Sequence, residues 1–152
     1  MGNTFVDANT KEGSDFVLNT RLTHVFLQGT PDNTCKIKSI GQKAFSMERP
    51  GETALEGSLM HIDIPSSLRN IALKAFYYCD RLKVLNLKNV TTFGSHCLSN
   101  VGSKADITPE DMLYISGDVT HIASEAFRYS KWWKIQLGSA AKPIASLTAL
   151  AR

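Results

Sequence analysis

Three cysteines are the residues in this 152-residue chain with the greatest potential for covalent chemistry. Cys35, Cys79 and Cys97 are widely spaced and odd in number, so they form neither a CxxC metal knuckle nor a complete disulfide framework. A nucleophilic cysteine also needs a nearby base, which the sequence around Cys79 does not supply. We therefore expect free thiols. Cys79 is predicted to be half-buried, Cys97 buried, and Cys35 exposed in a loop.

Histidines offer a second possible chemistry, that of a metal site. His24 and His61 occupy the same position of a repeated motif described below, and Asp63 follows two residues after His61. Two imidazoles and one carboxylate can hold a divalent metal. Solvated histidine pairs on a sheet are much commoner, however, so we predict neither a metal nor a cofactor.

Composition and signature motifs argue against several other functions. The formal net charge of +3 comes from 17 basic and 14 acidic residues spread along the chain, which does not favour nucleic-acid binding. No apolar run approaches the roughly 18 residues of a membrane span. GxSxG, HExxH, phosphate-loop and Rossmann signatures are all missing, so we do not expect an enzyme. The N-terminal residues do not resemble a signal peptide, which leaves a cytoplasmic location possible.

A repeated hexad is the main feature of the sequence. Its pattern is a large apolar residue, a small residue, two variable residues, a small residue and a large apolar residue. The four copies are IGQKAF (40–45), IALKAF (71–76), FGSHCL (93–98) and IASEAF (122–127). Because the fifth position always holds alanine or cysteine, we expect a column there that is too tight for larger side chains.

A second motif, LxxLxL, has apolar residues at positions 0, 3 and 5 and begins at residues 22, 59, 82, 110 and 132. The shortest steps give a basic unit of about 22 residues. Longer steps contain stretches rich in Gly, Pro, Asp and Ser, which are typical of loops. The sequence therefore predicts one domain over residues 1–152, with an N-terminal cap (1–21), five coils (22–137) and a C-terminal half-coil or cap (138–152).

Each LxxLxL motif is predicted to be a short strand. Positions 3 and 5 then face the core, whereas positions 2, 4 and 6 face outward. One such strand cannot bury its apolar side alone, but stacked coils can pair strands in parallel at about 4.8 Å. We predict a β-rich α/β solenoid with a parallel sheet of about five short strands, returned by short helical or irregular segments. The predicted interior spine is Val25, Ile62, Leu85, Leu113 and Ile135.

These repeats resemble the leucine-rich repeat superfamily, and specifically the BspA-like class of bacterial surface proteins, whose units are similar to IxxIGxxAFxxCxxLxxIxIP. LRNIALKAFYYCDRLKVLNL (68–87) fits this unit nearly throughout. The resemblance covers residues 22–137 and implies a non-catalytic protein-binding module, at the cell surface or secreted, that adheres to a host extracellular or cell-surface protein. Departures at Phe93, Cys97, Leu98 and Glu110 predict less regular packing in coils 3 and 4.

The outward-facing positions form the candidate binding surface. Mixed aromatic, amide and charged side chains on a rigid sheet suit protein recognition, because they lose little entropy on binding. The candidates are His24, Phe26, His61, Asp63, Asn86, Lys88, Met112, Tyr114, Lys134 and Gln136. Trp133 is a further candidate, since an exposed tryptophan beside a lysine is typical of interfaces and of sugar stacking.

Two other functions remain open at this point. The coils could serve as a structural spacer or scaffold, or Trp133 could make the chain a carbohydrate-binding module. The ligand and the oligomeric state do not follow from the sequence.

Overall fold

The computed structural model describes residues 23–27, 36–48, 58–83, 86–106, 108, 112–115, 118–131 and 134–137. At residues 112 and 134–137 only the backbone is described. The predicted N-terminal cap and C-terminal half-coil lie outside the described residues. So do Cys35, Leu85, Glu110 and Trp133.

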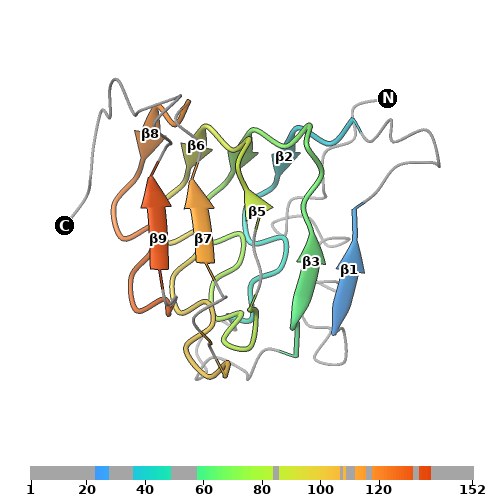
Figure 1. The fold of residues 1–152 in the computed structure, drawn as a ribbon, viewed down its shortest axis with the longest axis vertical. Helices are drawn as coiled ribbons and strands as arrows, with labels where there is room; N and C mark the ends of the chain where they lie inside the picture. The colour runs from blue at the N-terminus through green and yellow to red at the C-terminus, as the bar shows by residue number, and fades with distance from the viewer. Residues whose placement is uncertain are drawn as a thin grey trace.

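Short strands, all paired in parallel, recur along the described part of the chain (Figure 1). The LxxLxL motifs form β1 (His24–Phe26), β3 (His61–Asp63), β5 (Asn86–Leu87), β7 (Met112–Ile115) and β9 (Lys134–Leu137). The beginnings of the hexads form β2 (Ser39–Ile40), β4 (Asn70–Ile71), β6 (Thr92–Phe93) and β8 (His121–Ile122).

The five LxxLxL strands stack in chain order along one side of the molecule (Figure 1). β1 pairs with β3, and β5, β7 and β9 form a second paired group. The Lys83 amide donates to the Met60 carbonyl at 3.2 Å, which joins the segments leading into β3 and β5. Val25, Ile62 and Leu113 of the predicted spine are buried. We call the solvent side of these strands the outer face.

A second sheet, which the sequence analysis did not predict, runs along the hexads. Its strand order is β2-β4-β6-β8, and it pairs the first apolar residues of successive hexads, Ile40, Ile71, Phe93 and Ile122. Their partly exposed polar neighbours are linked too, because the side-chain Nδ2 of Asn70 donates to Ser39 Oγ at 2.8 Å and Thr92 Oγ1 donates to Asn70 Oδ1 at 2.7 Å. Each of the first four coils therefore contributes two strands, one to each side of the stack.

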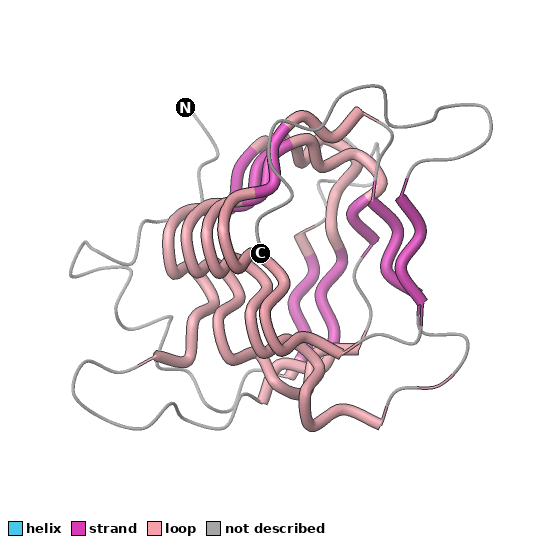
Figure 2. Tube along the Cα trace, turned by 90° about the vertical axis from the view of Figure 1, so that its left-hand side faces the viewer, coloured by secondary structure: helices cyan, strands magenta, loops and turns pink. Residues whose placement is uncertain are grey.

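The rest of each hexad forms turns, and no helix occurs in the described residues. We call these stacked segments (41–48, 72–79, 94–101 and 123–130) the turn wall, where successive loops lie one behind another (Figure 2). The Ala75 amide returns to the Ala72 carbonyl at 3.3 Å, whereas the flanking amides of Lys74 and Phe76 reach the next coil at 2.9 and 2.8 Å. Alternate amides thus close a turn or join two coils.

Left-handed backbone recurs in the turn wall at residues that are not glycine. The fourth hexad position has a φ of 53 to 56° in all four copies, at Lys43, Lys74, His96 and Glu125. Three further cases follow four residues later, at Tyr78, Asn100 and Tyr129. This conformation costs roughly 1–2 kcal/mol per residue. It persists because the hydrogen bonds within and between coils leave the backbone no alternative.

Large aromatic side chains from the hexads fill the core. Phe76 is fully buried and stacks on Phe45 with ring centroids 5.2 Å apart, and Phe93 contacts Phe127 at 5.3 Å. The predicted tight column is confirmed as buried at Ala44, Ala75, Cys97 and Ala126. The expectation of irregular packing at the third hexad was wrong, because Phe93, Cys97 and Leu98 are fully buried and its amides continue the bonding pattern.

Candidate functional site

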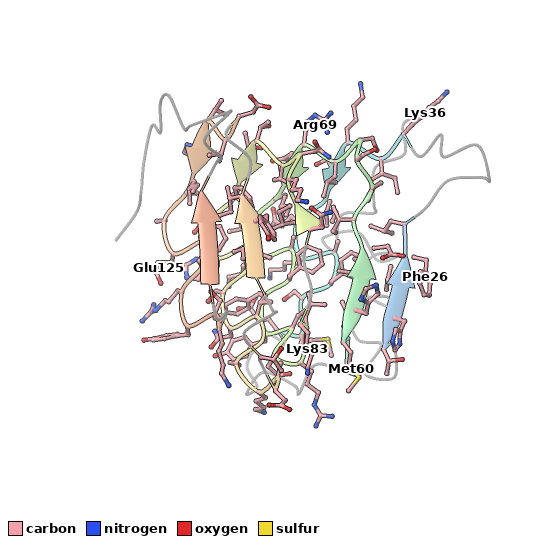
Figure 3. The ribbon with its side chains drawn as sticks, in the orientation of Figure 1. Phe26, Lys36, Met60, Arg69, Lys83 and Glu125 are labelled. Atoms are coloured by element: carbon pink, nitrogen blue, oxygen red, sulfur yellow. The ribbon has the colours of Figure 1, made fainter. Side chains whose placement is uncertain are left out.

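The outer face at β1 and β3 brings four of the predicted binding residues together. The register pairs His24 with His61 and Phe26 with Asp63, as the motif spacing predicts. The ring of His61 lies 6.0 Å from that of His24 and 6.3 Å from that of Phe26. Phe26 is 67% exposed although it is apolar (Figure 3). This corner therefore presents one hydrophobic ring among titratable groups on a paired strand.

At β5 and β7 the outer face carries a second group. Asn86 pairs with Tyr114 in the register, and the Lys88 ammonium lies 5.0 Å from the centre of the Tyr114 ring. Asn86 Oδ1 accepts a hydrogen bond from the Lys88 amide at 3.3 Å, which fixes the turn that follows the strand. An amide, a cation and an aromatic ring are thus held next to one another.

The remaining candidates on this face are placed by backbone alone. The register sets Met112 beside Lys134 and Tyr114 beside Gln136, as the motif spacing predicts. Trp133 lies outside the described residues.

The histidine geometry bears on the metal hypothesis. His61 Nε2 is 2.9 Å from Asp63 Oδ1, and His24 Nδ1 is 3.0 Å from its neighbour Thr23 Oγ1. The Asp63 carboxylate is therefore within hydrogen-bonding distance of the His61 imidazole, and the His24 imidazole is within hydrogen-bonding distance of the Thr23 hydroxyl. Among the residues that the structure describes, no three His, Cys, Asp or Glu side chains are grouped to hold a metal ion.

The two described cysteines are buried and free. Cys79 is fully buried rather than half-buried as predicted, and its thiol donates to the Phe45 carbonyl at 3.1 Å. Burial, together with the charge of Asp80, raises the pKa of the Cys79 thiol far above its ordinary value. Burial also raises the pKa of Cys97, whose predicted burial is confirmed. Neither sulfur is suited to nucleophilic attack, because the thiolate is the reactive form.

Alkylation should show this inertness directly. In the folded protein at neutral pH, we expect Cys79 and Cys97 to react with iodoacetamide at least on the order of 100-fold more slowly than in denaturant, because the core must open first. Peptide-resolved mass spectrometry measures both sites in one sample. Rapid labelling of Cys79 without loss of fold would contradict its structural role.

A polar cluster on the turn wall lies away from the outer face. Glu48 pairs with Lys74 at 2.6 Å and with Lys43 at 3.3 Å. Burial raises the Glu48 pKa, but the hydrogen bonds and charges of these two lysines lower it by more, so the net pKa is below its ordinary value. The cluster ties the first hexad to the second. Sequence reasoning missed it because Lys74 lies 26 residues from Glu48 and Lys43 has a left-handed backbone, so no local spacing marks the pairing.

A depression at the lower end of the outer face also escaped sequence reasoning. Its volume is about 240 Å³, and it is lined by Met60, Arg81, Lys83, Lys104, Ala105 and Asp106. We call it the base pocket. Met60 and Lys83 lie at this end of the molecule in Figure 3. Three chain segments contribute, so no local motif marks it.

In the described part of the chain, no helix has the length and apolar character needed to cross a membrane.

Comparison with known proteins gives one match. No curated protein and no solved structure matches the chain. A family model, the BspA type leucine rich repeat region, matches residues 13–148 with six copies. Because this match covers most of the sequence and agrees with the stacked parallel strands, the chain belongs to the BspA-type leucine-rich repeat family.

Proposed function

We propose that this chain is a non-catalytic protein-binding module of a bacterial cell-surface or secreted, adhesin-like protein, and that its outer face is the binding surface. Membership of the BspA-type family supports a repeat protein of the surface-associated, protein-binding kind. The observation that carries the choice of face is Phe26, a large apolar ring with 67% of its surface exposed on a hydrogen-bonded strand.

The physical argument rests on preorganisation. A side chain on a paired strand has little backbone entropy left to lose, so more of its contact energy appears as affinity. Aromatic residues and their neighbours commonly dominate binding energy in protein interfaces. Phe26 beside His61, and Tyr114 beneath Lys88, supply two such anchors with polar surroundings.

The described thiols favour binding over catalysis. Both are inside the core, and the Cys79 sulfur already donates to a backbone carbonyl. The outer-face groups, by comparison, are accessible and held by neighbours in the same sheet.

Capture of purified extracellular-matrix proteins tests this proposal. A double variant, Phe26→Ala with Tyr114→Ala, should weaken capture by about tenfold or more, which corresponds to about 1.4 kcal/mol and is modest for two anchors. Tyr129→Ala is the matched control, because Tyr129 is also 67% exposed but lies on the turn wall. It should change capture less than about twofold.

The other outcomes are informative as well. If the double variant and the control bind equally well, the binding surface is not the outer face. If the unaltered protein captures none of the matrix proteins, the adhesive role is wrong. A spacer or scaffold role would then be the better account, and light scattering over a range of concentrations would show whether the chain self-associates end to end.

A further inference from the structure

The base pocket is built by backbone contacts between coils. Met60 precedes β3 and Lys83 precedes β5. The Lys83 amide donates a hydrogen bond to the Met60 carbonyl at 3.2 Å. On the other side, the Lys104 amide donates to the Asp80 carbonyl at 2.8 Å. Ala105 forms part of the lining and is buried, whereas Met60 is 44% exposed. The pocket thus combines an apolar floor with a fixed frame.

Basic side chains dominate its surroundings. Arg81, Lys83 and Lys104 line the pocket, and Lys131 Nζ donates to the Ala105 carbonyl at 3.3 Å. Two carboxylates of the described residues are close by. Asp106 belongs to the lining, and Asp80, which is buried, pairs with Lys104 at 3.1 Å. Among the residues that the structure describes, four cations stand against two carboxylates, which leaves a positive rim, although Arg81, Lys104 and Lys131 each already contact other protein groups.

We propose that the base pocket binds an acidic segment of a partner protein, with one apolar side chain on the Met60 and Ala105 floor and flanking carboxylates at the basic rim. This goes beyond the outer-face proposal and rests on it only in taking a protein as the ligand. Complementary charge also speeds association with such a segment and fixes its orientation.

Size and charge argue for this ligand over others. At about 240 Å³ the pocket is smaller than the roughly 300–1,000 Å³ typical of small-molecule sites, so it suits one side chain better than a cofactor. A bare phosphate would leave the apolar floor unused. Nucleic acid needs an extended basic surface, whereas the net charge of the whole chain is only +3.

Fluorescence anisotropy with a labelled synthetic peptide, in which each leucine is flanked by glutamates, tests the inference on the full chain. We expect binding that weakens with added salt. The double variant Arg81→Ala with Lys83→Ala should weaken binding about fivefold or more, and Met60→Ala should weaken it without changing the salt dependence. Lys36→Ala with Lys38→Ala removes the same charge at the opposite end, where Figure 3 places Lys36, and should have less than about a twofold effect.

Several results would overturn the proposal. These are no binding of the peptide, equal weakening by the Lys36/Lys38 control, equal binding of a peptide with serine in place of leucine, or displacement by inorganic phosphate at concentrations near those of the peptide. Lys83→Glu alone serves as a second variant if the double variant has a lower thermal midpoint. The Phe26/Tyr114 variant should bind the peptide normally, so failure at one surface can be told from failure at the other.

Discussion

Replacing Phe76 with alanine is expected to lower the free energy of unfolding by about 3–5 kcal/mol. Phe76 is among the largest side chains that are fully buried in the described part of the chain, and it stacks on Phe45 with the rings only 7° from parallel. Its removal loses apolar burial and leaves a cavity that flanking coils cannot close, because hydrogen bonds hold their spacing. The loss is a large share of the roughly 5–15 kcal/mol that stabilises a typical domain.

Urea denaturation followed by circular dichroism measures this effect. Leu73→Ala is the control, because Leu73 lies in the same hexad but is an exposed position, and its removal should cost less than about 1 kcal/mol. Equal losses for the two variants would mean that the hexads do not pack around Phe76.

Replacing Gly94 with alanine is expected to destabilise the stack by about 2–4 kcal/mol, through crowding instead of a cavity. A Cβ at this position would lie 2.6 Å from the Leu73 amide nitrogen and 2.7 Å from the Ala72 carbonyl carbon. Both atoms are backbone, so no side-chain rotation relieves the contact. Coils 2 and 3 would have to separate, and the hydrogen bond that the Gly94 amide donates to the Ile71 carbonyl at 2.7 Å would lengthen.

Thermal unfolding of Gly94→Ala beside Ala123→Gly checks this reasoning. Ala123 has the same hexad position in the following coil, and losing its methyl should cost no more than about 1 kcal/mol. A Gly94→Ala variant as stable as the unaltered protein would show that coils 2 and 3 leave room for a methyl group at this position.

The strand motifs were largely predictable because their signal is both repeated and two-sided. Position 3 faces the core at Val25, Ile62 and Leu113, and the motif spacing alone paired His24 with His61. Apolar alternation fixes which side of a strand is buried, and equal spacing fixes which residues stack. The outer-face corner of Phe26, His61 and Asp63 follows from those two facts.

Other features left no readable trace in the sequence. Each strand of the β2-β4-β6-β8 sheet has only two residues, which is too short for an alternation to appear. The left-handed positions hold Lys43, His96 and Glu125 instead of the glycine that usually signals such a backbone. The base pocket combines Met60, Lys83 and Lys104 from three separate chain segments, and a cavity depends on how their side chains fill space.

The hydrogen bonds that each coil of the turn wall donates to the next coil give the wall a net dipole. The peptide unit between Leu73 and Lys74 accepts from the Lys43 amide behind it and donates to the Ser95 carbonyl ahead, and the units ending at Phe76 and Tyr78 are oriented in the same way. Peptide dipoles therefore add along the axis of the stack, as they do in an α-helix, with the positive pole toward coil 4. The fourth hexad position matches this polarity, with Lys43 toward the negative pole and Glu125 toward the positive one.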